Sequence, residues 1–121
     1  MTNAVEQKAM EIVMAYEKAQ GRHPQDVSRT RCSYDIKSDN RCIEVKGQGS
    51  KRAGWILINN SIVRNLGKNL SNYYIYIVYD IKAEPKLKIL EADTIFKNLK
   101  IDTVFLLTTA VINEHGNNIK I

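Results

Sequence analysis

Residues 33–46, with the sequence SYDIKSDNRCIEVK, decide the fold of this chain because they predict a β-hairpin. Apolar and polar residues alternate on both sides of the pair Asp39-Asn40, and such a pair favours a two-residue turn because it tolerates positive φ. With this turn, Ser38 pairs with Arg41, and the two strands run antiparallel away from it. The stretch therefore predicts two adjacent strands whose register is fixed by the turn.

The predicted hairpin register brings two carboxylates and a lysine to one face. It places Asp35 opposite Glu44, and Lys46 lies two residues further along the same strand. Two like charges about 5 Å apart repel each other unless something neutralises them, and a divalent cation with oxygen ligands is the usual remedy. A lysine beside such a cation suggests chemistry on a phosphate. The alternative is a solvated hairpin face with an ordinary Glu–Lys ion pair.

The pattern Glu-x-Lys occurs three times, at Glu6-Gln7-Lys8, at Glu44-Val45-Lys46 and at Glu84-Pro85-Lys86. The first copy lies in a helical pattern, where residues two apart do not face each other. The last copy contains a proline within a polar connection, which predicts a turn. Only the middle copy lies on an apolar strand with an aspartate across the hairpin, so it is the candidate site.

Asp35, eight intervening residues and then Glu44-Val45-Lys46 resemble the PD-(D/E)XK nuclease superfamily, which has the restriction-endonuclease-like fold. The wider sequence, over roughly residues 9–48, is similar to the small nuclease-like domain at the C-terminus of the plant NO VEIN protein and its microbial relatives. Ser33 departs from that pattern, because these relatives usually carry glycine before the Tyr-Asp pair. The matching residues are Ala15-Tyr16-Glu17, Gly21-Arg22, Asp26-Val27-Ser28, Tyr34-Asp35-Ile36 and Ile43-Glu44-Val45-Lys46-Gly47.

The resemblance implies metal-dependent hydrolysis of phosphodiester bonds in nucleic acid, by a Mg²⁺-dependent DNA endonuclease. Asp35, Glu44 and the backbone carbonyl of Val45 would be the ligands of Mg²⁺, for which Mn²⁺ could substitute. The metal would polarise the phosphate and lower the pKa of the attacking water. Lys46 would orient that water or offset the charge that grows on the phosphate oxygens.

Two further residues join the candidate catalytic set through the resemblance. Glu17 borders the apolar stripe of the first predicted helix and would be an outer-sphere or second-metal carboxylate. The alternative for Glu17 is an ordinary glutamate on the helix surface. Gln48 continues the face of Lys46 and resembles a glutamine that some relatives use beside the lysine, and its alternative is an ordinary loop residue.

The rest of the pattern predicts an α/β fold in a single domain spanning residues 1–121. A helix capped by Asn3 runs to about Gln20 and stops at Gly21. Helix, hairpin, third strand, helix and fourth strand give the core order α-β-β-β-α-β of the restriction-endonuclease-like fold, a mixed central sheet flanked by helices. The further elements expected are a short extended piece at Asp26–Arg29, strands at Trp55–Ile58, Tyr73–Tyr79, Leu87–Leu90 and Thr103–Thr108, helices at Ser61–Asn69 and Ala92–Leu99, and an irregular tail from Asn113.

The chain is mildly basic, with 18 Lys and Arg against 13 Asp and Glu and a formal net charge of +5. A basic surface around a small acidic pocket suits a polyanion such as nucleic acid. The loop after the hairpin supplies Lys51 and Arg52 as phosphate-binding residues, with Arg29 and Arg31 as second choices, although each could equally be a solvated charge. Trp55 and the tyrosines are expected in the core rather than as base-stacking platforms.

Other functions and partners are open at this point. A Holliday-junction-resolvase-type nuclease would have a similar size and charge, and a non-catalytic nucleic-acid-binding module could keep the same fold. Cutting both strands needs two sites, which favours a homodimer, and relatives of this kind are often attached to helicases or restriction components. No run is long enough for a membrane span and no targeting signal is evident. Cys32 and Cys42 fall in opposite phases of the hairpin, which predicts reduced thiols in a cytoplasmic protein.

Overall fold

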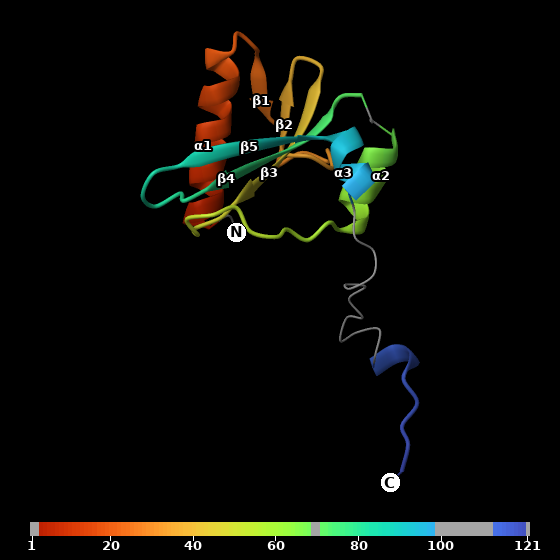
Figure 1. The fold of residues 1–121 in the computed structure, drawn as a ribbon. Coiled ribbons are helices and arrows are strands. Elements are labelled where there is room, and N and C mark those ends of the chain that lie inside the picture. The colour runs from red at the N-terminus through yellow and green to blue at the C-terminus, as the bar shows by residue number, and fades with distance from the viewer. Residues whose placement is uncertain (1–2, 69–70, 99–112, 121) are drawn as a thin grey trace.

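The computed structural model describes residues 3–68, 71–98 and 113–120, and within them it shows a mixed sheet flanked by helices (Figure 1). The predicted α/β class is therefore confirmed. The first six elements follow the predicted order α-β-β-β-α-β. In chain order the elements are α1 (Ala4–Ala19), β1 (Pro24–Asp26), β2 (Ile36–Ser38), β3 (Arg41–Gly47), α2 (Asn60–Lys68), β4 (Tyr73–Tyr79), β5 (Lys86–Glu91) and α3 (Ala92–Asn98).

Helix α1 has the ends that its sequence predicts. The Asn3 side chain accepts a hydrogen bond from the Glu6 amide at 2.8 Å, which satisfies one of the free amides of the first turn. After the helix the chain turns at Gly21, whose φ of 84° is a conformation that glycine adopts without strain. Ala9 and Val13 are fully buried, so this face of α1 packs against the sheet.

The described strands form one sheet in the order β1-β2-β3-β4-β5. Neighbouring strands are antiparallel except β3 and β4, which run parallel and are connected through α2. Ser38 pairs with Arg41 across the turn, and Asp39 has a φ of 51°. Both observations confirm the predicted two-residue hairpin loop.

Helix α1 lies on one side of the sheet and α2 and α3 lie on the other (Figure 1), and each face of the sheet has its own core. One core lies between α1 and the sheet, and the other lies under α2, α3 and residues 53–58. Because side chains alternate along a strand, Ile43 and Val45 of β3 contribute to the α1 side, whereas Cys42 contributes to the α2/α3 side. This alternation directs Glu44 and Lys46 to the side on which α2 and α3 pack.

Three predicted elements need correction. The expected strand at Trp55–Ile58 is not a strand, because β4 already pairs with the edge of β3 and residues 53–58 pack across the sheet face instead. The third strand of the core is β1, so the extended piece expected at Asp26–Arg29 lies earlier in the chain and residues 28–31 form turns. The tail expected to be irregular from Asn113 begins with one helical turn, residues 113–115.

Other expectations have simpler outcomes. The strand expected at Thr103–Thr108 lies outside the described residues. Cys32 is exposed, Cys42 is buried and both are free thiols, as the hairpin phase predicts. None of the helices in the described part of the chain is long and apolar enough to cross a membrane.

Candidate active site

Asp35 and Glu44 meet at the point where the hairpin ladder ends. The regular pairing stops at Ile36 and Ile43, and the amide of Asp35 donates to the carbonyl of Ile43 at 2.9 Å. A regular continuation would leave Asp35 and Glu44 as a pair without mutual backbone hydrogen bonds, so this bond marks a bulge-like departure from the ladder. The carboxylate of Asp35 accepts a hydrogen bond from the Val45 amide at 2.8 Å, and this bond fixes its position beside β3.

A pocket of about 360 Å³ opens at this edge of β3. It contains the predicted trio of Asp35, Glu44 and Lys46 together with Val45, so the structure brings together the two carboxylates, the lysine and the strand between them. The rest of its wall comes from α1 and from the loop before the hairpin. These additional lining residues are Glu6, Ala9, Met10, Ser28, Arg29 and Gly47.

The two carboxyl groups of the pocket both have raised pKa values, and a hydrogen bond joins them. Burial, and after it the neighbouring Asp35 carboxylate, raise the pKa of Glu44 to about 8, although the Lys46 ammonium opposes the shift. Burial also raises the pKa of Asp35, against the hydrogen bond from the Val45 amide. Near neutral pH, Glu44 is therefore mainly protonated and donates a hydrogen bond to Asp35. The Lys46 Nζ lies 3.9 Å from Glu44 Oε1, at the outer limit of an ion pair.

Gly47 allows α1 to approach β3 at the edge of the pocket. A Cβ atom added at Gly47 would lie 3.1 Å from Ala9 Cβ and 3.1 Å from Val5 Cγ1, a spacing tighter than side chains normally tolerate. The glycine after the Glu-Val-Lys sequence therefore serves the packing of the helix, and through it the shape of the pocket wall.

Two residues near the site were missed by sequence reasoning. Tyr73, opposite Cys42 in the parallel pair, has a buried hydroxyl without a hydrogen-bond partner among the described residues. Burial, followed by the nearby carboxylates of Glu44 and Asp35, raises the pKa of Tyr73. The carboxylate that α1 contributes to the pocket wall is that of Glu6. Neither residue had a sequence signal, because Tyr73 lies in an apolar strand and Glu6 in the exposed first turn of a helix.

The structure does not bring Glu17 to the pocket. Its fully buried carboxylate lies on the α1 side of the sheet, where Arg22 donates from Nε and Nη2 and the Tyr76 hydroxyl donates at 2.8 Å. Burial alone would raise the pKa of Glu17, but the hydrogen bonds of Arg22 and Tyr76 outweigh it and lower the pKa. Glu17 is thus a structural carboxylate, and its main partner, Arg22, follows it closely in the sequence.

Gln48 lies beyond the pocket and holds the following loop. Its Oε1 accepts from the Gly54 amide at 2.7 Å, and its Nε2 donates to the carbonyls of Gly54 and Trp55 at 3.1 and 3.3 Å. These bonds occupy both polar atoms of the side chain. Gln48 therefore holds residues 54 and 55 close to the end of β3, and it does not line the pocket of the two carboxylates.

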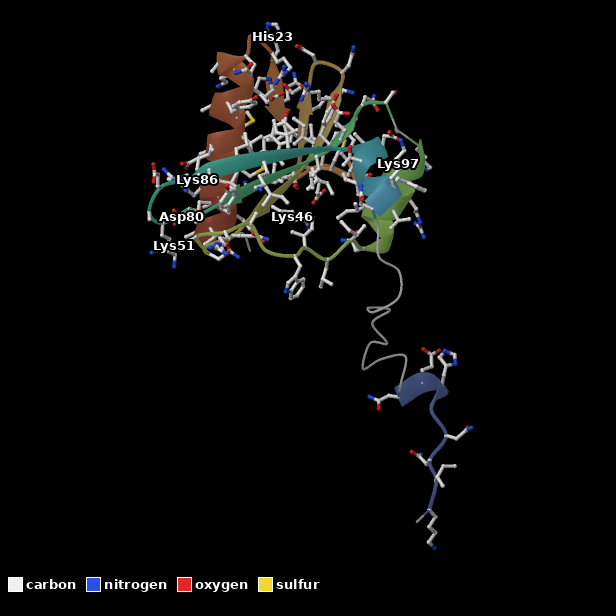
Figure 2. The ribbon with its side chains drawn as sticks, viewed as in Figure 1. His23, Lys46, Lys51, Asp80, Lys86 and Lys97 are labelled. Carbon is white, nitrogen blue, oxygen red and sulfur yellow. The ribbon has the colours of Figure 1, made fainter. Side chains whose placement is uncertain are left out.

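The predicted basic residues have different positions. Arg29 lines the pocket, whereas Arg31, Lys51 and Arg52 are exposed and lie outside it. Figure 2 shows Lys51 beside Asp80 and away from Lys46, in agreement with the hydrogen bond from the Asp80 amide to the carbonyl of Ser50. Of the four arginines and lysines predicted to contact phosphate, Arg29 is the one at the carboxylate pair.

The donor set of the pocket fits a hard divalent cation with few protein ligands. Two partly buried carboxyl groups in contact repel each other once both are ionised, and a cation removes that repulsion. Among the described residues there is no group of three or more His, Cys, Asp and Glu side chains that could hold a metal. Mg²⁺ typically takes one or two carboxylates and keeps several waters, so two carboxylates and the Val45 carbonyl suffice, whereas a structural zinc site would need more ligands.

The fold and this pocket define an α/β domain with a site made of two partly buried carboxylates and a lysine. The family model described as Protein NO VEIN, C-terminal matches residues 5–90, which is more than half of the 121 residues. The chain therefore belongs to the NO VEIN C-terminal family. The matched range extends from the start of α1 into β5, so it contains the complete pocket. No curated protein and no solved structure matches the chain.

Proposed function

We propose that this protein is a metal-dependent nuclease that hydrolyses phosphodiester bonds, with DNA as its substrate. The observation that carries the proposal is the contact between Asp35 and Glu44 in a pocket that also contains Lys46. A site built only for stability would pair each buried carboxylate with a cation or a donor, as the chain does at Glu17. The resemblance to PD-(D/E)XK nucleases supplies the reaction class, and the net charge of +5 suits a polyanionic substrate.

Asp35 and Glu44, with the Val45 carbonyl, would hold Mg²⁺ or Mn²⁺. The bound metal would supply a positive charge that polarises the phosphate and a water of lowered pKa. Asp35 is held for this task by the Val45 amide, so its carboxylate needs little reorganisation when a cation enters. Glu44 must be deprotonated to bind the cation, and because its pKa is raised to about 8, cation binding should be weaker at lower pH.

Lys46 and Arg29 would act on the substrate phosphates. The Lys46 ammonium keeps a positive charge 3.9 Å from Glu44 and would stabilise the negative charge that develops on the phosphate oxygens. Arg29 lines the same pocket and would hold an adjacent phosphate in place. Glu6 borders the pocket from α1, whereas Glu17 does not. Glu6 would therefore be the helix carboxylate available to a metal-bound water.

The proposal is tested by incubating the purified protein with supercoiled plasmid, branched DNA and single-stranded DNA in Mg²⁺, Mn²⁺ or EDTA. We expect cutting that needs the metal, and a loss of about 100-fold or more in Glu44→Gln and in Lys46→Ala. The matched controls are Glu84→Gln and Lys86→Ala, which alter an exposed copy of the same Glu-x-Lys pattern and should cut like the wild type.

The pattern of substrates separates the remaining alternatives. Strong preference for branched DNA would identify a resolvase-type activity within the same proposal. Retardation of DNA in a gel without cutting in either metal would contradict the nuclease and favour a binding module. Equal cutting by wild type and Glu44→Gln would also contradict the proposal, because the activity would then come from another site or a contaminant.

A further inference from the structure

Trp55 lies fully on the surface, although its sequence neighbours are apolar. Its exposed fraction is 82%, the highest among the large hydrophobic residues of the described chain. The expectation that Trp55 belongs to the core is therefore wrong. Its neighbours Ile56 and Ile58 pack against the sheet, and alternation then turns Trp55 and the 54% exposed Leu57 outward.

The backbone that presents Trp55 is held in place. Gln48 donates to the carbonyls of Gly54 and Trp55, and it accepts from the Gly54 amide. Gln48 follows Lys46 by two residues, roughly 7 Å along an extended chain. Its hydrogen bonds therefore hold the Trp55 backbone close to the end of β3, the strand that carries Glu44 and Lys46. An indole on such a fixed backbone loses little conformational entropy when a ligand stacks on it.

The stretch of sequence that contains Trp55 is basic, which favours a polyanion. Between Lys46 and Tyr79 the sequence contains no Asp or Glu, whereas it contains basic residues on both sides of Trp55. Figure 2 shows that Lys46 lies on the side of the sheet facing the connection from β3 to α2, which carries Trp55. The basic residues of this stretch are Lys46, Lys51, Arg52, Arg64 and Lys68.

We propose that Trp55 is a stacking platform for an unpaired nucleobase on the strand whose phosphate enters the pocket. An exposed indole between basic residues is the combination by which proteins hold single-stranded nucleic acid. Bases inside a duplex are already stacked on their neighbours, so the platform selects substrates with single-stranded, flapped or frayed segments. This inference rests on the proposed nuclease function and narrows its substrate class.

Trp55 is the one tryptophan of the chain, so its fluorescence reports on stacking without a label. The wild-type protein would be titrated in EDTA, where no cutting is expected, with a single-stranded oligonucleotide and with a blunt duplex of the same length. We expect strong quenching by the single strand and weaker quenching by the duplex. Trp55→Ala should weaken single-strand binding, measured by anisotropy of a labelled oligonucleotide, roughly fivefold or more. Leu57→Ala, on the same outward face, is the matched control and should bind like the wild type.

Three results would overturn the stacking platform. They are equal quenching by single strand and duplex, unchanged affinity in Trp55→Ala, and a Trp55 emission that responds to protein concentration rather than to nucleic acid. The last result would make the indole part of a protein interface.

The same samples distinguish failure of the inference from failure of the nuclease. Metal-dependent cutting without quenching would leave the proposed function standing and overturn the platform. Quenching by single strands in a protein that cuts nothing in Mg²⁺ or Mn²⁺ would support the platform and contradict the nuclease. In Glu44→Gln, we expect cutting to be lost and quenching to remain, because Trp55 is not among the residues that line the pocket.

Discussion

Glu17 and the pair Asp35 and Glu44 lie on opposite sides of the sheet, and the fold satisfies their carboxylates in different ways. On the α1 side, Glu17 receives hydrogen bonds from Arg22 and from the Tyr76 hydroxyl, and these bonds lower its pKa. On the other side, Asp35 and Glu44 lie against each other, and their pKa values are raised. The chain therefore satisfies one buried charge internally and leaves the other pair dependent on a proton or a cation.

This difference is one between a carboxylate that is satisfied within the fold and a pair that is not. A protein interior tolerates a buried carboxylate when donors and opposite charge surround it, as at Glu17. A pair of carboxylates with one lysine at 3.9 Å is poorly satisfied, and such a pair persists where its chemistry is used. The following changes test whether the two sites differ in this way.

The largest effect is expected at Glu17. Glu17→Ala leaves Arg22 without its buried partner, so the free energy of unfolding should fall by about 3–5 kcal/mol. Urea unfolding followed by circular dichroism measures the change. Glu11→Ala, on the exposed face of the same helix, is the matched control and should cost less than about 1 kcal/mol. If Glu17→Ala and Glu11→Ala lowered the free energy of unfolding equally, the structural role inferred for Glu17 would be contradicted.

An intermediate effect is expected from pH at the carboxylate pair. The pKa of Glu44 is raised from 4.5 to about 8, so the folded state binds a proton that the unfolded state has lost. In metal-free buffer the free energy of unfolding should therefore fall as pH rises from about 5 to 8. Glu44→Gln removes this slope and should be more stable than the wild type at pH 8, on the order of 1 kcal/mol.

The opposite slope is expected at Glu17, because its pKa is lowered in the folded state. Its contribution is present above pH 4.5 and should be lost as pH falls below that value. Unfolding curves of the wild type, Glu17→Gln and Glu44→Gln, measured from below pH 4.5 up to pH 8, would compare the two sites in one experiment. If Glu17 and Glu44 made the free energy of unfolding change with pH in the same direction, the two sites would not differ as we infer.

The smallest effect on stability is expected at Lys46. Its side chain is 29% exposed and its contact with Glu44 is long, so Lys46→Met should change the free energy of unfolding by less than about 1 kcal/mol. The same variant should lose DNA cutting, because it lacks the charge beside the phosphate. A loss of several kcal/mol in urea unfolding would instead make Lys46 a structural residue.

The hairpin and its site were predictable from the sequence because they depend on short-range rules. The turn pair Asp39-Asn40 fixes the register, and the register alone brings Asp35 close to Glu44. The departure from the ladder at Asp35 was not predictable, because the side chain that holds it there bonds to a backbone amide, that of Val45, which has no sequence signal. Alternation also predicted correctly that Ile36, Ile43 and Val45 share a face, whereas Tyr34, beyond the end of the ladder, packs on the opposite face.

Tertiary contacts decided what the sequence could not. The alternation at Trp55–Ile58 is that of a strand, but the edge of β3 was taken by β4, and the segment lies across the face of the sheet. Glu17 was predicted to be catalytic because it borders the apolar stripe of α1, and it is indeed buried, but it bonds to Arg22 and Tyr76 and does not line the pocket. A helical periodicity gives the buried face of a helix, not the partner that each buried residue meets.

Calorimetric titration of the protein with Mn²⁺ or Mg²⁺ near pH 7 would show whether Asp35 and Glu44 bind a divalent cation. Repeating the titration in buffers of different ionisation enthalpy counts the protons released. We predict binding with release of a large fraction of one proton in the wild type, since Glu44 has a pKa of about 8, and no such release in Glu44→Gln. Equal cation affinity in the wild type and in Glu44→Gln, or no cation binding by the wild type, would contradict a cation site at Asp35 and Glu44.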